Sequence, residues 1–305
     1  MPSMFLQLAH KVLKEEKRPL SAPEIWGMAQ AKGYEKDLAT KGKTPWATLG
    51  AMLYVDVRDN PMSDFVSTGK APKRFVLREL LDQDKGILDI QSPATEKVAG
   101  YLEKDIHPFL VYFGFYYLRA HLKTIRHHKS EKKRFGEWVH PDLVGCYFPF
   151  DDWEDEVVEV SSVMGNPAIK LYSFELKREL SIGNLREAFF QAVSNSSWAN
   201  EGYLAAVDID VDEEFRGELN RLSASFGIGV IRIDIGDPDS SEIVYPAKAR
   251  EVVDWEAVNK LASVNPDFCA FLRRIRMDMK SREVRREMYD GLIDRELLVE
   301  SLRKR

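Results

Sequence analysis

Residues 171–177 read LYSFELK, with apolar and polar side chains in alternation. This period is typical of a half-buried β-strand, in which residues two apart lie on the same face of the sheet. Glu175 and Lys177 are therefore expected on one face, and Phe174 and Leu176 on the other. Burying a carboxylate and an ammonium in an apolar strand is costly unless each finds a partner. The segment therefore predicts a strand that carries a polar site.

An aspartate from a neighbouring strand would complete a site of two carboxylates and one lysine. Asp142 is the candidate, because it follows Pro141 in an otherwise apolar segment that reads as a strand. Carboxylate oxygens bind Mg²⁺, which usually keeps several waters and meets a phosphate group. The lysine can orient or activate a water, or stabilise charge on a phosphate oxygen. Glu-x-Lys is also common on solvated strand faces, so the motif indicates a functional site only together with the order of the elements around it.

The composition is that of an ordinary globular chain. The sequence has 305 residues, 44% hydrophobic and 30% charged, which is enough for two domains with their own cores. Two cysteines make no disulfide framework or zinc cluster, so a reducing, cytoplasmic location is expected. No apolar run reaches the ~18 residues of a transmembrane helix, and the first residues lack a signal-peptide pattern. No membrane partner is therefore expected.

Residues 1–80 predict three helices and a hairpin. Helical spacing of apolar residues runs through 5–16, a capping box begins a second helix at Ser21, and Thr44-Pro45 begins a third. Residues 65–77 read as two short strands joined by a basic, turn-rich loop. This combination is a winged helix-turn-helix, in which the third helix usually reads a DNA groove and the hairpin loop contacts the backbone.

The same residues carry a set of short motifs, which are Pro19-Leu20 with Glu24-Ile25, Gly42-Lys43-Thr44-Pro45 with Thr48-Leu49, Leu53-Tyr54, Asp59-Asn60, Ser63-Asp64-Phe65 and Gly69-Lys70-Ala71-Pro72-Lys73-Arg74-Phe75. In these motifs the chain resembles the HARE-HTH domain family over positions 3–79. Such domains occur fused to chromatin, polymerase and restriction proteins, so the resemblance implies binding of double-stranded DNA, with the reading of modified bases left open.

Candidate DNA contacts cluster on the predicted wing and at the start of the third helix. Basic residues so placed contact phosphates. Residues 1–80 hold 13 Lys and Arg against 9 Asp and Glu, a net charge of +4, whereas the remainder holds 31 against 40, a net charge of −9. The alternative is that these charges are only solvated and that the winged helix binds a protein. The candidates are Lys43, Thr44, Lys70, Lys73 and Arg74.

Residues 95–305 predict alternating helices and strands, and the polar stretch 81–94 is the expected linker. The apolar strands are nearly continuous, which is typical of an α/β layer covered on both faces. The acidic tract 151–159 is too dense to be buried and is expected to be an exposed connection or strand edge rather than a metal site. The expected elements are one or two helices between 94 and 118, strands at 122–127, 137–148 and 171–177, a helix at 184–197, a strand at 202–208, a helix at 214–225, a strand at 227–234, and helices at 254–262, 266–279 and from 282.

Pro141-Asp142 followed by Glu175-Leu176-Lys177 resembles the PD-(D/E)XK nuclease superfamily. The resemblance implies a restriction-endonuclease-like mixed sheet flanked by helices, in the order αβββαβ. It also implies that Asp142 and Glu175 bind Mg²⁺ and that Lys177 handles the attacking water. Some members add a Glu from the first core helix and a Gln from the helix after the motif, for which Glu103 and Gln191 are the candidates.

His127 and His128 lie in the basic run 119–134, which holds seven Lys or Arg against one acid. Such a run is most often a solvated face, although beside a carboxylate site it can steer a polyanion. Adjacent strand residues point to opposite faces, so the two histidines cannot easily ligate one ion. We interpret them as phosphate-side or structural residues.

The sequence thus predicts an α/β protein in which a winged helix is joined to a Mg²⁺-dependent DNA endonuclease domain, in a setting of bacterial restriction or defence. One alternative is a DNA-binding regulator whose nuclease-like domain is a non-catalytic scaffold, and another is a protein-interaction adaptor. One catalytic constellation cuts one strand, so a homodimer is expected. The candidate interface is Phe268, Phe271, Leu272 and Ile275, unless these side chains cover the sheet of their own subunit.

Overall fold

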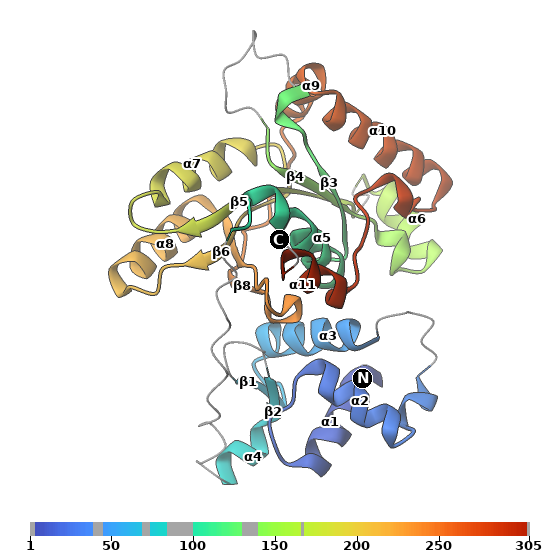
Figure 1. Ribbon diagram of the computed structural model, residues 1–305. Helices are drawn as coiled ribbons and strands as arrows, with labels where there is room; N and C mark the ends of the chain where they lie inside the picture. Colours follow the sequence, from blue (N-terminus) through green and yellow to red (C-terminus); the bar gives the residue numbers. More distant parts are fainter. Residues whose placement is uncertain are drawn as a thin grey trace. The chain divides into compact units, whose positions relative to one another are not determined.

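The computed structural model describes residues 4–38, 45–68, 74–83, 100–129, 140–165 and 168–303 (Figure 1). The chain divides into two compact units. The first is built mainly on residues 1–97, and the second on most of residues 98–305. Residues 84–94, which make up most of the predicted linker, lie outside the described ranges. No helix of the described ranges is long and apolar enough to cross a membrane.

The first unit has three main helices followed by an antiparallel hairpin, as the sequence predicts. The capping box is present, since the Ser21 amide donates to the Glu24 carboxylate at 2.8 Å. A 3₁₀ turn after the second helix and a short helix after the hairpin were not predicted. The elements are α1 (Met4–Glu16), α2 (Ala22–Ala31), η1 (Tyr34–Asp37), α3 (Pro45–Asp59), β1 (Phe65–Thr68), β2 (Arg74–Leu77) and α4 (Arg78–Gln83).

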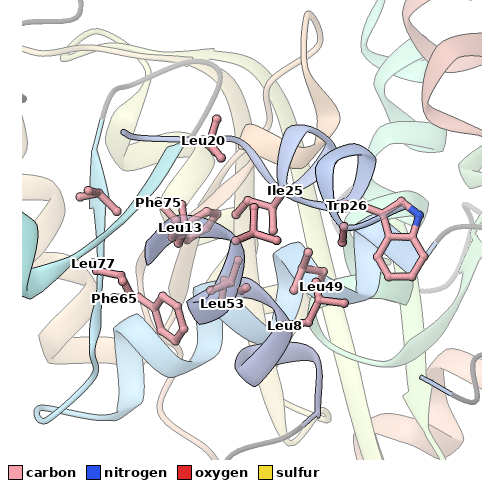
Figure 2. Packing of buried hydrophobic residues seen from close by; sticks show 14 of the residues in the cluster. Leu8, Leu13, Leu20, Ile25, Trp26, Leu49, Leu53, Phe65, Phe75 and Leu77 are labelled. Atoms are coloured by element: carbon pink, nitrogen blue, oxygen red, sulfur yellow. The ribbon is translucent and has the colours of Figure 1, made fainter. Parts of the chain in front are cut away.

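The apolar faces of these elements pack into one core (Figure 2). Leu13, Ile25 and Leu53 come from the three main helices and are fully buried, with Phe75 of β2 against them. Burial of this apolar surface is the main force that holds the unit together. Leu20 and Phe75 also exchange two backbone hydrogen bonds, of 3.0 and 2.8 Å. The hairpin is therefore tied directly to the segment that leads into α2.

From residue 100 onward, helices and strands alternate around a six-stranded mixed sheet. The elements are α5 (Glu103–Tyr117), β3 (Ala120–Thr124), η3 (His127–Lys129), β4 (Leu143–Tyr147), η4 (Pro149–Asp151), α6 (Asp155–Val163), β5 (Lys170–Leu180), α7 (Leu185–Asn195), β6 (Glu201–Ile209), α8 (Glu213–Phe226), β7 (Gly229–Arg232), η5 (Pro238–Ser240), β8 (Glu242–Tyr245), α9 (Trp255–Val264), α10 (Pro266–Ser281), η6 (Arg286–Met288) and α11 (Arg295–Arg303).

The strand order is β3-β4-β5-β6-β7-β8, in which β3, β4 and β5 are antiparallel neighbours and β5, β6 and β7 are parallel. The last strand, β8, runs antiparallel to β7. With α6 set aside, the elements from α5 to β6 follow the order αβββαβ. The prediction of an α/β chain with a mixed sheet flanked by helices is therefore confirmed.

Helices cover both faces of the sheet. Val144 and Cys146 of β4 pack against α9 and α10. The residue between them, Gly145, faces Leu122 of β3. The helix α5 lies against the side of the sheet that carries the Leu122 side chain. Its close approach depends on Gly114, because a Cβ at position 114 would collide with Leu122. Figure 1 shows α7 and α8 beside β5 and β6, and their apolar side chains share one core with β6 and β7.

The structure refines the expectation for the acidic tract and decides between the two interpretations of the apolar C-terminal residues. The acidic tract 151–159 is exposed as predicted, but most of it belongs to a turn of 3₁₀ helix and to α6. Phe268, Phe271 and Ile275 are buried against their own sheet, at 0%, 3% and 9% exposure, and Leu272 packs against the same cluster. These side chains are therefore part of the core rather than an exposed interface.

Candidate active site

The pairing of β4 with β5 brings Asp142 to Glu175. β4 pairs antiparallel with β5, and its first pair is Leu143 with Phe174, so Asp142 enters β4 beside the part of β5 that carries Glu175. The Asp142 amide donates to the Phe174 carbonyl at 3.1 Å. Its carboxylate Oδ2 accepts the Leu176 amide at 2.8 Å. The negative charge of Asp142 acts on Glu175, so the two carboxylates lie close together.

Glu175 and Lys177 share one face of the sheet, as the alternation predicts. Lys177 Nζ lies 2.8 Å from Glu175 Oε1. The Glu175 side chain is 1% exposed, whereas that of Lys177 is 21% exposed. The carboxylate is therefore the inner member of the pair, and the ammonium lies between it and solvent.

The contact between His127 and Asp142 was not predicted from the sequence. His127 Nε2 lies 3.1 Å from Asp142 Oδ1. The predicted strand through 127 was too long, since β3 ends at Thr124 and residues 127–129 form a 3₁₀ turn. The alternation of strand faces therefore does not apply to residues 127 and 128. Both histidines are exposed, and the turn brings the His127 ring to Asp142.

Of the two less certain candidates, one lies at the site. Glu103, the first residue of α5, is half-buried, and its carboxylate interacts electrostatically with Lys177, Asp142 and His127. Gln191 is half-buried on α7, and no hydrogen bond between it and the site is found in the described part of the chain. Asn195, one turn later on α7, donates instead to Glu175 Oε2 at 3.0 Å.

Asn195 lies inside the helix predicted at 184–197 and was missed, because the local sequence does not show which polar residue of a helix face reaches the site. The available signal was its spacing of four from Gln191, since residues four apart share a helix face. The helix face was therefore predicted correctly, although the contacting side chain was not.

Burial and mutual repulsion set the charges of the acids. Burial, and then the negative charge of Asp142, raise the pKa of Glu175 to about 7. Burial also raises the pKa of Glu103. For Asp142, burial is outweighed by hydrogen bonds from His127 and the Leu176 amide, which lower its pKa overall. The site therefore favours the ionised form of Asp142. Ionisation of Glu175 beside it is unfavourable unless a positive charge lies close to both carboxylates.

The pKa of Lys177 is raised above its ordinary value, because attraction to Glu175 and Asp142 outweighs the effect of burial. Lys177 is thus an ammonium at neutral pH. It can donate hydrogen bonds and stabilise negative charge, but it does not act as a free base in this state.

Two carboxylates in this arrangement suit a hard divalent cation. Among the residues that the structure describes, no three His, Cys, Asp or Glu side chains come together as metal ligands. Mg²⁺ is usually bound by one or two carboxylates, with waters and phosphate oxygens completing its shell. Asp142 and Glu175 fit this donor set, and a cation between them would offset the repulsion that raises the pKa of Glu175.

The residues predicted to contact DNA are only partly described. Lys43, Thr44, Lys70 and Lys73 lie outside the described ranges. Arg74, the first residue of β2, donates to the Glu24 carboxylate at 2.9 Å and to the Pro19 carbonyl at 3.2 Å. Its guanidinium therefore ties the hairpin to the start of α2, and its charge is offset by Glu24.

Comparisons with known proteins bear on the two units differently. No curated protein and no solved structure matches the chain. The nuclease resemblance of the second unit therefore remains a proposal. The HARE-HTH family model, whose description includes "ASXL, restriction endonuclease HTH domain", matches residues 4–80, which span the three helices and the hairpin. Residues 4–80 are thus a HARE-HTH domain.

Proposed function

We propose that this protein is a Mg²⁺-dependent DNA endonuclease that acts in bacterial restriction or defence, with its HARE-HTH domain binding double-stranded DNA. The observation that carries the proposal is the meeting of Asp142, Glu175 and Lys177 at one point of a mixed sheet with αβββαβ order. Two acids can hold a divalent cation and a lysine can stabilise charge on a phosphate oxygen, and both roles suit metal-assisted hydrolysis of a phosphodiester. The HARE-HTH domain supports DNA as the polymer that is cut.

Asp142 and Glu175 would hold the Mg²⁺ ion, and the chemistry it supplies there is Lewis-acid stabilisation of phosphate charge. The Leu176 amide and His127 hold the two oxygens of Asp142 in a fixed orientation. Lys177, as an ammonium, donates to a phosphate oxygen or orients the attacking water. Glu103 interacts electrostatically with Asp142 and Lys177 and would add negative charge near the ion.

A cleavage assay tests the proposal. The full chain is incubated with unmodified DNA and with DNA carrying modified bases, each with Mg²⁺ and with EDTA. We expect cuts that require Mg²⁺ in at least one substrate. Binding to DNA without cleavage of any substrate would favour the alternative, a DNA-binding regulator with a non-catalytic nuclease-like domain.

DNA binding is tested separately, by fluorescence anisotropy of a labelled duplex over a salt series. Contacts with phosphates release counterions, so we expect the affinity to fall steeply between about 50 and 200 mM salt. Absence of binding even at the lowest salt would leave the winged helix as a protein-interaction module.

We also propose that two copies act together on duplex DNA, because one constellation cuts one strand at a time. A two-fold assembly is the commonest symmetry of soluble oligomers and would supply the second site. Light scattering of the protein, alone and with DNA, measures the mass. A monomer in both conditions that still makes double-strand cuts would overturn the dimer.

A further inference from the structure

We propose that Asn195 is a positioning residue that holds Glu175 and the segment before Asp142 at a fixed separation, an inference that rests on the function proposed above. Asn195 is the last residue of α7 and is 2% exposed. Its side-chain nitrogen contacts protein acceptors rather than the open side of the site. Its proposed role is to act through the two carboxylates that would hold the metal.

The amide of Asn195 joins the two strands that carry the acids. Its Nδ2 donates to Glu175 Oε2 at 3.0 Å and to the His140 carbonyl at 3.1 Å. His140 lies two residues before Asp142. One nitrogen therefore links the Glu175 side chain on β5 to the backbone that leads into β4.

The backbone of Asn195 is itself held in place from two directions. Its carbonyl accepts the Ser173 hydroxyl at 2.9 Å and the Trp198 indole N–H at 2.8 Å. Trp198 is 1% exposed and packs edge-on against Phe268. The amide is thus carried by a rigid support, which is what the accurate placement of a metal-binding carboxylate requires.

The chemistry of the amide explains why this position suits Asn. Both neighbours are acceptors, and an Asn nitrogen can donate one hydrogen to each. An Asp here would face them with two further acceptor oxygens and a third negative charge. The Asn195 Oδ1 has no hydrogen-bond partner within the described ranges. Burial of an unsatisfied acceptor lowers stability, so the residue is better explained by the placement of its donor than by its contribution to folding.

Three variants separate positioning from folding. Asn195→Ala removes the donor, Asn195→Asp keeps the shape but reverses its hydrogen-bonding role, and Ser194→Ala changes an exposed neighbour on the same helix as the control. We expect Asn195→Ala and Asn195→Asp to lower the Mg²⁺ affinity measured by calorimetry by about 10- to 100-fold, as loss of an outer contact to a ligand typically does. We expect kcat for cleavage to fall by a similar factor, with KM for DNA unchanged. Ser194→Ala should match the wild type.

A reciprocal exchange keeps the test decisive if Asn195→Asp folds poorly. Glu175→Gln added to Asn195→Asp restores an amide–carboxylate hydrogen bond with the partners reversed. The melting temperature should recover part of the loss, while Mg²⁺ binding should be lost in the double variant, because the Glu175 carboxylate is no longer present. Wild-type Mg²⁺ affinity and kcat in a folded Asn195→Ala variant would overturn the proposal, as would an exchange that recovers no stability. If the wild type neither binds Mg²⁺ nor cuts DNA, the proposed function fails, and the exchange alone decides whether Asn195 holds Glu175.

Discussion

The second unit buries acidic side chains in two places, and the two places differ in their balance of charge. On α10, Asp278 is fully buried and pairs with Arg274, while the Tyr289 hydroxyl donates to it at 2.8 Å. One acid there meets one base. Beside β4 and β5, three acids interact with the Lys177 ammonium and with His127, whose pKa is raised by its hydrogen bond to Asp142.

This difference in charge balance distinguishes a structural ion pair from a candidate catalytic site. A buried pair is tolerated when each charge has its partner, as Arg274 and Asp278 have, although the Arg274 Nε has no acceptor within the described ranges. An unbalanced group of acids is unfavourable, and here the imbalance adds to burial in raising the pKa of Glu175 to about 7. Strongly perturbed acids of this kind are concentrated at functional sites. We therefore expect substitutions at the two places to have opposite consequences for stability and activity.

The largest effect is expected at the unbalanced site. Asp142→Ala, Glu175→Ala and Lys177→Ala should each reduce cleavage by at least about 10²- to 10³-fold, because each removes a group that acts on the reacting phosphate. DNA affinity should be retained. Lys170→Ala is the control, since Lys170 lies on the same strand but is exposed and pairs with Glu201. Full activity in any folded variant would remove that residue from the catalytic set.

The balanced pair should show the reverse. Asp278→Ala leaves the Arg274 guanidinium buried without its acid, which is expected to cost about 3–5 kcal/mol of the free energy of unfolding. Urea unfolding followed by circular dichroism measures the loss. Replacing both residues, as Arg274→Met with Asp278→Leu, should cost less than the single change. A wild-type unfolding midpoint for Asp278→Ala would show that the pair contributes nothing to stability.

A smaller effect, of opposite sign, is expected for Glu175→Gln in Mg²⁺-free buffer. Because the pKa of Glu175 is raised from 4.5 to about 7, the folded state binds its proton more tightly than the unfolded state. The stability contributed by this group is therefore complete below about pH 4.5 and is lost as the pH rises through about 7. Glu175→Gln cannot ionise, so it should be more stable than the wild type at pH 8, by at most about 3 kcal/mol.

Thermal melts of the wild type and Glu175→Gln at about pH 4.5 and about pH 8 measure this difference. We expect the two curves to lie closer at the lower pH. Added Mg²⁺ should raise the melting temperature of the wild type at the higher pH and not that of Glu175→Gln. If the melting temperatures of both proteins depended equally on pH, Glu175 would not be the acid whose raised pKa lowers stability at high pH.

The smallest effect is expected for the half-exposed pair in the first unit. Arg74 and Glu24 are 23% and 37% exposed, so solvent screens their attraction. Arg74→Ala should reduce the free energy of unfolding by no more than about 1 kcal/mol. Chemical denaturation of the full chain, following the HARE-HTH unit, provides the measurement. A loss comparable with that of Asp278→Ala would show that this pair carries more of the fold than its exposure implies.

Local patterns in the sequence predicted the features that depend on near neighbours. The capping box at Ser21 and the spacing of apolar residues located the helices of the HARE-HTH domain. The alternation through residues 171–177 placed Glu175 and Lys177 on one face, and the apolar context of Asp142 identified the acid beside them. Each of these follows from the geometry of one helix or strand.

Only the tertiary structure decided which distant side chains complete the site and which residues are buried. His127 contacts Asp142 because β3 ends early, and Asn195 contacts Glu175 because α7 packs across β5. Phe268 and Arg274 lie inside because α10 covers the sheet. These contacts depend on strand register and on how a helix docks, which are set by the sum of many weak interactions between residues far apart in the chain. Periodicity shows that a helix has a buried face, but the partner of each side chain on that face is determined only by the packing.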